Sequence, residues 1–136
     1  MSDEVPSVFV VDDDSGIRKS LTRLLRAAGY KPLPFESAED FLRTVPAKSS
    51  GCLISDLCMP GFDGLALQRE LSSRGSELPV IFLTADGDPS KAAQAMKNGA
   101  AHFLTKPVEA AVLLRAIREA LDRDRAEEQK SGQIEN

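Results

Sequence analysis

The chain has few of the residues that build disulfide frameworks and zinc sites. Its 136 residues include two cysteines, Cys52 and Cys58, and one histidine, His102, and no Cys-x-x-Cys pair occurs. Disulfide scaffolds and structural zinc sites need more of these side chains at closer spacing. We therefore expect two free thiols, and we expect Cys52, which lies in an apolar run, to be a small core residue.

The sequence also lacks a long apolar run and an excess of positive charge. No segment approaches the ~20 apolar residues of a membrane span, and residues 1–4 are acidic, unlike the basic and apolar start of a secretory signal. The formal net charge is -4, whereas binding of nucleic acid depends on clustered Lys and Arg. These absences predict a cytoplasmic protein with no membrane anchor and no direct binding of nucleic acid.

What the sequence does have is a set of short apolar runs that stop at reactive polar residues. Four such runs occur, and their ends carry carboxylates, a hydroxyl and an ammonium. The residues at these ends are Asp12-Asp13-Asp14, Ser55-Asp56, Thr84 and Thr105-Lys106. Parallel strands have their carboxyl ends at one edge of a sheet, where open α/β sheets bind ligands. The pattern therefore predicts a site that these residues share.

Helical patterns alternate with the predicted strands. A helix capped by Ser15 and stopped at Gly29 follows the first run, and a strand over residues 31–35 is interrupted by proline, which suits a sheet edge. A capping box from Ser37 to Asp40 opens the next helix. Three more strand–helix pairs complete the pattern, which predicts an α/β fold with a five-stranded, doubly wound parallel sheet.

The length of the chain is that of one domain. We expect this domain to span residues 1–121. From Asp122 onward the sequence loses its apolar face and ends in small polar residues. This change predicts a polar linker or a disordered tail over residues 122–136.

The carboxylates at the strand ends suit a divalent cation and phosphoryl chemistry. Asp12, Asp13 and Asp56 repel one another at close range unless a cation neutralises them, and Mg²⁺ takes carboxylates, waters and a phosphate oxygen in an open cleft. An aspartate beside the metal can attack a phosphoryl group and form an acyl phosphate. We predict that Asp56 does so, that Thr84 donates to one phosphoryl oxygen, and that Lys106 pairs with another.

Each of these residues also has a structural interpretation when it is taken alone. Residues Asp12 to Asp14 fit a solvated turn before a helix, and Asp56 fits a turn. Thr84 fits the end of a strand, and a lone Lys106 fits a solvated surface charge. Only the joint pattern predicts a functional site.

Four motifs, in order along the chain, resemble the receiver domain of bacterial two-component response regulators. They are Val10 to Asp14, Ser55 to Gly64, Phe82 to Ala85 and Gly99 to Pro107. The resemblance spans about residues 7 to 121. Residues 37–39 together with Gly87 and Asp88 look most like the FixJ-type branch, whose receivers usually precede a helix-turn-helix DNA-binding domain.

The resemblance implies a flavodoxin-like (βα)5 fold with strand order 2-1-3-4-5. It implies that a sensor histidine kinase phosphorylates Asp56 in a reaction that depends on Mg²⁺. Asp13, Asp56 and the backbone carbonyl of Cys58 would hold the Mg²⁺, and Asp12 would assist through a water.

The resemblance also implies a switch. Thr84 and Lys106 would bind the phosphoryl group, the Lys106–Pro107 bond would be cis, and Phe103 would be the switch aromatic. In such domains the threonine moves toward the phosphoryl group and the aromatic side chain turns inward. This movement remodels the surface of residues 90–97, of the strand at Phe103 and of the helix after it.

The sequence departs from the common pattern near the site. Phe103 stands where many receivers have Tyr, and we hypothesise that Phe103 favours burial even without phosphate. Asp14 replaces a frequent Glu, and we expect little effect. Cys58, Ala85 and Asp86 are expected to flank the mouth of the cleft, where Asp86 would repel small anionic phosphodonors.

The sequence thus predicts a signalling switch rather than a conventional enzyme. Phosphorylation would promote a homodimer and control an output domain that this chain does not contain, which makes transcription regulation the expected role. One alternative is a stand-alone receiver that acts by protein–protein interaction, with or without phosphate. Another is an aspartyl-nucleophile phosphatase of the haloacid-dehalogenase type, which needs a second acid where this chain has Cys58.

Overall fold

The chain folds into five strand–helix pairs, as the sequence predicts. The computed structural model describes residues 5–85 and 88–134, and side chains up to residue 123. The elements are β1 (Ser7–Val11), α1 (Ser15–Ala27), β2 (Lys31–Phe35), α2 (Ala38–Thr44), β3 (Cys52–Ser55), α3 (Gly64–Ser73), β4 (Val80–Thr84), α4 (Pro89–Lys97), β5 (His102–Thr105) and α5 (Ala110–Ile134).

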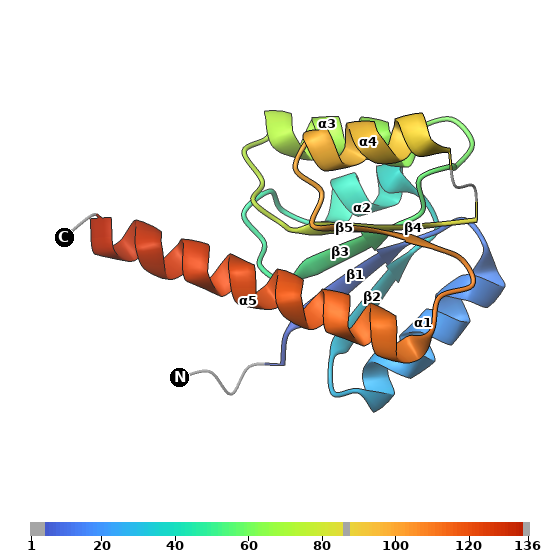
Figure 1. Ribbon diagram of the computed structural model, residues 1–136, viewed down its shortest axis with the longest axis horizontal. Coiled ribbons are helices and arrows are strands. Elements are labelled where there is room, and N and C mark those ends of the chain that lie inside the picture. Colours follow the sequence, from blue (N-terminus) through green and yellow to red (C-terminus); the bar gives the residue numbers. More distant parts are fainter. Residues whose placement is uncertain (1–4, 86–87, 135–136) are drawn as a thin grey trace.

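The five strands form one parallel sheet in the order β2-β1-β3-β4-β5. Helices α2, α3 and α4 cover one face, and α1 and α5 cover the other (Figure 1). The predicted doubly wound, flavodoxin-like fold and its strand order are therefore confirmed. Strand β2 lies at an edge of the sheet and pairs with β1 on one side. Pro32 and Pro34, which have no backbone N–H, are tolerated there because an edge strand takes part in one ladder of hydrogen bonds and not two.

Both faces of the sheet are buried, which explains why its inner strands read as unbroken apolar runs. Side chains of β1 alternate between the faces: Phe9 and Val11 pack toward α2, α3 and α4, whereas Val8 and Val10 pack toward α1 and α5. Cys52 is fully buried on the face that α1 and α5 cover, and neither cysteine forms a disulfide, as predicted.

Two helix starts test the predicted caps. The first helix is capped by Asp14 and not by Ser15, because the Asp14 carboxylate accepts from the amides of Gly16 (2.8 Å) and Ile17 (3.1 Å). The prediction of Ser15 is wrong by one residue, since the helix begins at Ser15 itself. The Ser37 cap is confirmed, and its hydroxyl accepts from the Asp40 amide at 3.1 Å.

Helix α5 continues to Ile134 and runs clear of the sheet (Figure 1). The sequence had predicted a polar linker or a disordered tail over residues 122–136, and no helix there. Losing an apolar face removes packing, but the Arg, Glu, Ala, Gln and Lys residues that follow favour a helix by themselves. The division at residue 121 between domain and linker stays a prediction.

We find no helix in the described parts of the chain with the length and apolar character needed to cross a membrane.

Candidate functional site

The ends of β1 and β3 bring three carboxylates together. Val11 and Ser55 are partners in the sheet, so Asp12 and Asp56, which follow them, emerge side by side. Asp12, Asp13 and Asp56 each offer an oxygen, and these oxygens all lie within 4.8 Å of one another. Asp12 and Asp56 are buried, whereas Asp13 is exposed. The predicted convergence of carboxylates at the carboxyl edge is therefore present.

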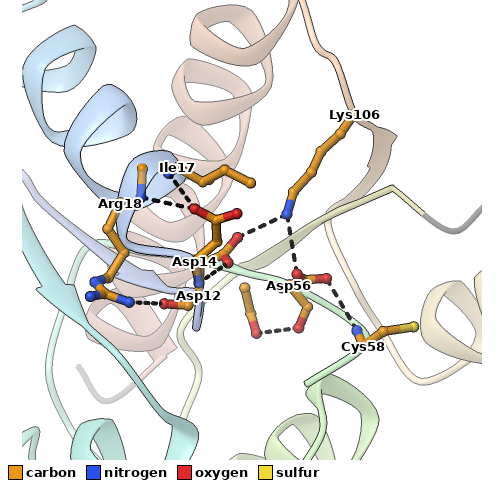
Figure 2. Close-up of polar contacts among 9 residues, drawn as sticks. Asp12, Asp14, Ile17, Arg18, Asp56, Cys58 and Lys106 are labelled. Atoms are coloured by element: carbon orange, nitrogen blue, oxygen red, sulfur yellow. Dashed lines mark hydrogen bonds and ion pairs between the residues drawn. The ribbon is translucent and has the colours of Figure 1, made fainter. Parts of the chain in front are cut away.

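An ammonium group from the end of β5 joins the carboxylates. The Nζ of Lys106 donates to Asp12 Oδ2 at 2.9 Å and to Asp56 Oδ2 at 3.1 Å (Figure 2). Burial alone lowers the pKa of this ammonium, but its hydrogen bonds to the two carboxylates outweigh burial and raise the pKa above its ordinary value. Lys106 thus stays charged at neutral pH, and its stabilising effect is lost only as the pH rises through that raised pKa.

Backbone groups orient the two buried carboxylates. The Cys58 amide donates to Asp56 Oδ1 at 3.1 Å, and the Asp14 amide donates to Asp12 Oδ1 at 2.9 Å (Figure 2). Arg18 holds the same loop from the other side, because its Nη1 donates to the Asp12 carbonyl oxygen at 2.7 Å. Each buried carboxylate therefore has one oxygen on an amide and the other on Lys106.

The charges at this site suit a divalent cation. Three carboxylates face one ammonium among the described side chains in contact with them, which leaves two uncompensated negative charges. Oxygen donors in an open cleft are the donor set that hard cations such as Mg²⁺ take. The residues present therefore fit a metal site, while the specific ligand set predicted above stays a prediction.

The predicted switch residues lie close to this edge. Thr84 ends β4, is buried, and pairs in register with Thr105, directly before Lys106. Phe103 on β5 is half-buried, and its ring centroid lies 6.4 Å from that of Phe82. Their roles and the hypothesis on Phe103 burial remain predictions. The Lys106–Pro107 bond is cis, as expected.

The residues expected to flank the cleft are described in part. Cys58 and Ala85 are exposed, and Asp86 lies outside the described residues. The Sγ of Cys58 lies 4.0 Å from Lys91 Nζ, at the start of α4. No sequence pattern predicts that Lys91 lies near the site, because Cys58, which it contacts, is 33 residues away in the chain.

Two residues that position the site were given no role from sequence. Arg18 contacts a carbonyl across a loop, which no spacing rule identifies. Gly64 packs against the backbone after β3, and a Cβ there would lie 2.6 Å from the Asp56 carbonyl oxygen and 2.8 Å from Leu57 Cα. Glycine is therefore required where the α3 helix approaches the loop that carries Asp56.

Comparison with known proteins points to one family. The response regulator receiver domain matches residues 8–118. The transcriptional regulatory protein TdiR of Thauera aromatica is 45% identical over 129 residues, which cover 93% of this chain and 57% of TdiR. The transcriptional regulatory protein FixJ of Bradyrhizobium diazoefficiens is 41% identical over 117 residues, which cover 83% of this chain and 57% of FixJ.

A solved structure agrees. The response regulator StyR superposes with a TM-score of 0.90 at 39% identity, covering 97% of this chain and 67% of that chain. The chain spans somewhat more than half the length of TdiR and FixJ. Fold, site and sequence lead to the same conclusion, and the chain belongs to the response regulator receiver family, with FixJ among its similar relatives.

Proposed function

We propose that this receiver takes a phosphoryl group from a sensor histidine kinase onto Asp56, in a reaction that depends on Mg²⁺. The observation that carries this proposal is the Lys106 ammonium shared between Asp12 and Asp56 within a cluster of three carboxylates. An ion pair at the surface needs one carboxylate and not three. A purely structural core does not bury two carboxylates.

The chain's own residues supply most of the chemistry. A carboxylate oxygen of Asp56 attacks the phosphorus, the new P–O bond forms as the P–N bond to the kinase histidine breaks, and the freed imidazole keeps the electron pair. The Cys58 amide holds the other Asp56 oxygen and so orients the nucleophile. Lys106 neutralises a phosphoryl oxygen, and the Thr84 hydroxyl donates to another.

Mg²⁺ would be held by Asp13, Asp56 and the backbone carbonyl of Cys58, with Asp12 assisting through a water. When bound, it offsets the negative charge of the carboxylates and of the phosphoryl oxygens. The product is an acyl phosphate that this domain slowly hydrolyses itself. The domain is thus a switch that is phosphorylated and not an enzyme that turns over a free substrate.

The signal leaves the site through α4, β5 and α5. The new charge on Asp56 draws Thr84 inward, Phe103 follows, and the surface of these three elements changes. We propose that this surface controls dimerisation and, in a longer protein, a DNA-binding output domain in the cytoplasm. The support is that TdiR and FixJ, which extend well beyond the aligned part, are both named transcriptional regulatory proteins.

Labelling by acetyl phosphate with Mg²⁺ tests the phosphoacceptor. We expect wild type and Asp122→Asn to be labelled equally and Asp56→Asn to lose all labelling, because Asp122 is an exposed carboxylate outside the site. Equal labelling of Asp56→Asn and wild type would overturn the proposal. Chelation of Mg²⁺ should slow labelling of wild type and Asp122→Asn alike.

Light scattering tests the proposed dimer. The molar mass of the chain is measured with and without beryllofluoride and Mg²⁺, a mimic of the phosphoryl group on Asp56. We expect the mass to rise toward that of a dimer with the mimic, and no rise in Asp56→Asn. An unchanged mass in wild type would reject dimerisation while leaving the phosphoacceptor intact.

A further inference from the structure

One buried polar side chain lies away from the carboxylates. Five polar or charged residues are buried in the described parts of the chain, and four of them stand at the carboxyl ends of the strands, where the site lies. These four are Asp12, Ser55, Asp56 and Thr84. The fifth, Gln68, is 6% exposed and belongs to α3, whose other buried side chains are leucines. The proposed function gives Gln68 no role.

Gln68 connects α3 to α4. Its Nε2 donates to the carbonyl oxygen of Ala95, the buried residue of α4, at 3.0 Å. A carbonyl oxygen only accepts hydrogen bonds, so the nitrogen of the Gln68 amide must face Ala95 and its oxygen must point elsewhere. The same Ala95 oxygen also accepts from the Ala100 amide at 3.0 Å, in the turn that ends α4. The Ala95 oxygen therefore keeps a donor even when Gln68 is replaced.

The side-chain oxygen of Gln68 is buried and has no hydrogen-bond partner within the part of the chain that the structure describes. Because this oxygen has almost no area in contact with solvent, water does not replace the missing donor. A buried acceptor without a donor costs its desolvation free energy, which exceeds the net gain from one amide hydrogen bond. The Gln68 amide therefore makes the contact between α3 and α4 less favourable than an apolar side chain of the same size would.

Displacement of α4 would remove this cost. Once Ala95 moves away from Gln68, water reaches both ends of the amide and supplies the donor that the oxygen lacks. An apolar side chain in the same place would instead expose apolar area to water when α4 moves, which is unfavourable. Gln68 thus lowers the free energy of displacing α4 in two ways, because the docked helix bears a cost and the displaced helix leaves a hydrated amide.

We propose that Gln68 regulates the receiver by keeping α4 easy to displace. The hydrogen bond to Ala95 fixes where α4 docks, and the oxygen without a donor keeps that docking weak. The inference rests on the proposed function, in which phosphorylation of Asp56 changes the surface of α4, and it names a residue that sets the free energy of that change. A residue with a purely structural role would stabilise the docked helix, whereas Gln68 makes its release easier.

Hydrogen exchange of the Ala100 amide in the full, unphosphorylated chain tests how firmly α4 docks, because this amide is released when the end of α4 opens. We expect exchange about five- to tenfold slower in Gln68→Met, since methionine is unbranched, of similar size and without a polar oxygen. Leu71→Met is the matched control, a buried change on the same helix that conserves volume and should not slow the exchange of Ala100.

Gln68→Glu should act in the opposite direction. A carboxylate in this position would face the Ala95 oxygen with no proton to donate, and displacement of α4 would hydrate it. We expect Ala100 to exchange about tenfold faster, or more, than in wild type at neutral pH. Gln68→Met keeps the test decisive even where Gln68→Glu does not fold.

Uptake of beryllofluoride with Mg²⁺ tests the link between Gln68 and the site. The Cys58 amide, which donates to Asp56, reports this uptake through its NMR shift. If the occupied site favours displacement of α4, a side chain that holds α4 more firmly must weaken the uptake, because coupling between two sites is reciprocal. We expect Gln68→Met to raise the concentration of beryllofluoride at half-saturation about threefold, and Leu71→Met to leave it unchanged.

The proposal is wrong if Ala100 exchanges at the wild-type rate, or faster, in Gln68→Met. It is also wrong if exchange slows but half-saturation by beryllofluoride is unchanged, since Gln68 would then affect the docking of α4 without regulating the site. A wild type that takes up no beryllofluoride would contradict the proposed function, and the regulatory role of Gln68 with it, even where Ala100 exchanges more slowly in Gln68→Met.

Discussion

Helices α4 and α5 pack on opposite faces of the same sheet and are held very differently. Helix α5 buries Leu113, Ala116, Ile117 and Ala120 in the aliphatic cluster beneath it, whereas α4 buries Ala95 as its single buried side chain. Met96 of α4 is 46% exposed. The hydrophobic effect thus anchors α5, while α4 depends on one methyl group, a cap and the Gln68 hydrogen bond.

This difference teaches how a receiver can be both stable and switchable. A helix with little buried area costs little to displace, because burial contributes roughly 25 cal/mol per Å² of apolar surface. Helix α4 begins shortly after Thr84 and carries Lys91 beside Cys58, close to the carboxylates. The weakly held helix is therefore the one that adjoins the site, and we expect the anchored helix to preserve the fold if α4 is displaced.

The largest effect should come from the anchored face. Ile117→Ala empties a fully buried position on α5, and we expect a loss of about 2–5 kcal/mol in the free energy of unfolding. Urea denaturation measures this loss. Val112→Ala, 40% exposed on the same helix, should change the free energy by less than about 0.5 kcal/mol. Similar losses of stability in the two variants would contradict the inference that the buried side chains of α5 anchor this helix.

Gly64→Ala should rank next and should affect the site as well. The added Cβ would meet the backbone at Asp56 and Leu57, and we expect a loss of about 1–3 kcal/mol together with slower phosphorylation. Gly16→Ala is the matched control, because its added Cβ would meet a side-chain atom, Asp14 Oδ1 at 3.2 Å, and no backbone atom at closer range. Normal phosphorylation in a stable Gly64→Ala protein would show that the loop after β3 tolerates displacement.

Ala95→Gly should have a smaller effect, confined to α4. Glycine removes the buried methyl and lowers helix propensity, which together cost about 1 kcal/mol. We expect faster hydrogen exchange at α4 amides and unchanged rates in the first three turns of α5. Equal acceleration in both helices would mean that α4 and α5 open as one cooperative unit, and the contrast drawn above would fail.

The smallest effect concerns the cap of α4 and its dependence on pH. Asp88 accepts from the Ser90 amide and hydroxyl, both at 3.0 Å, and the amide hydrogen bond lowers the pKa of this carboxyl below its ordinary value of 3.8. Because the folded pKa is lowered, the cap contributes fully above 3.8 and is lost as the pH falls through the lowered pKa.

We expect the Ser90 amide shift in NMR spectra to follow this titration and α4 amides to exchange faster once Asp88 is protonated. Asp88→Asn keeps a capping oxygen and should remove the pH dependence while leaving the helix start in place. An α4 start that frays at neutral pH in Asp88→Asn would show that the charge, rather than the hydrogen bond, holds the cap.

Much of the fold was predictable because its signals are local. Strand runs such as Val8 to Val11 are apolar throughout since both faces of the sheet are covered, and turns and caps punctuate the helices between them. The edge position of β2 followed from its prolines. The helix beyond Asp122 was not predicted, because the absence of an apolar face was taken as the absence of a helix.

The candidate site was predictable in its residues but not in its contacts. Motifs at the strand ends identified Asp12, Asp13, Asp56, Thr84 and Lys106, because parallel strands bring their carboxyl ends to one edge. Which oxygen of Asp56 meets Lys106 and which meets the Cys58 amide depends on the geometry of two loops. No spacing rule relates residues that are 50 positions apart.

The sequence by itself thus determined the alternation of strands and helices, the edge at which the reactive residues gather, and their chemistry. Those properties depend on nearest neighbours along the chain and on the pleat of a strand. The tertiary structure decided that Gln68 reaches the Ala95 carbonyl, that Gly64 packs against the Asp56 backbone, and that α4 buries a single side chain. These depend on how helices distant in sequence pack across a sheet, which no local pattern encodes.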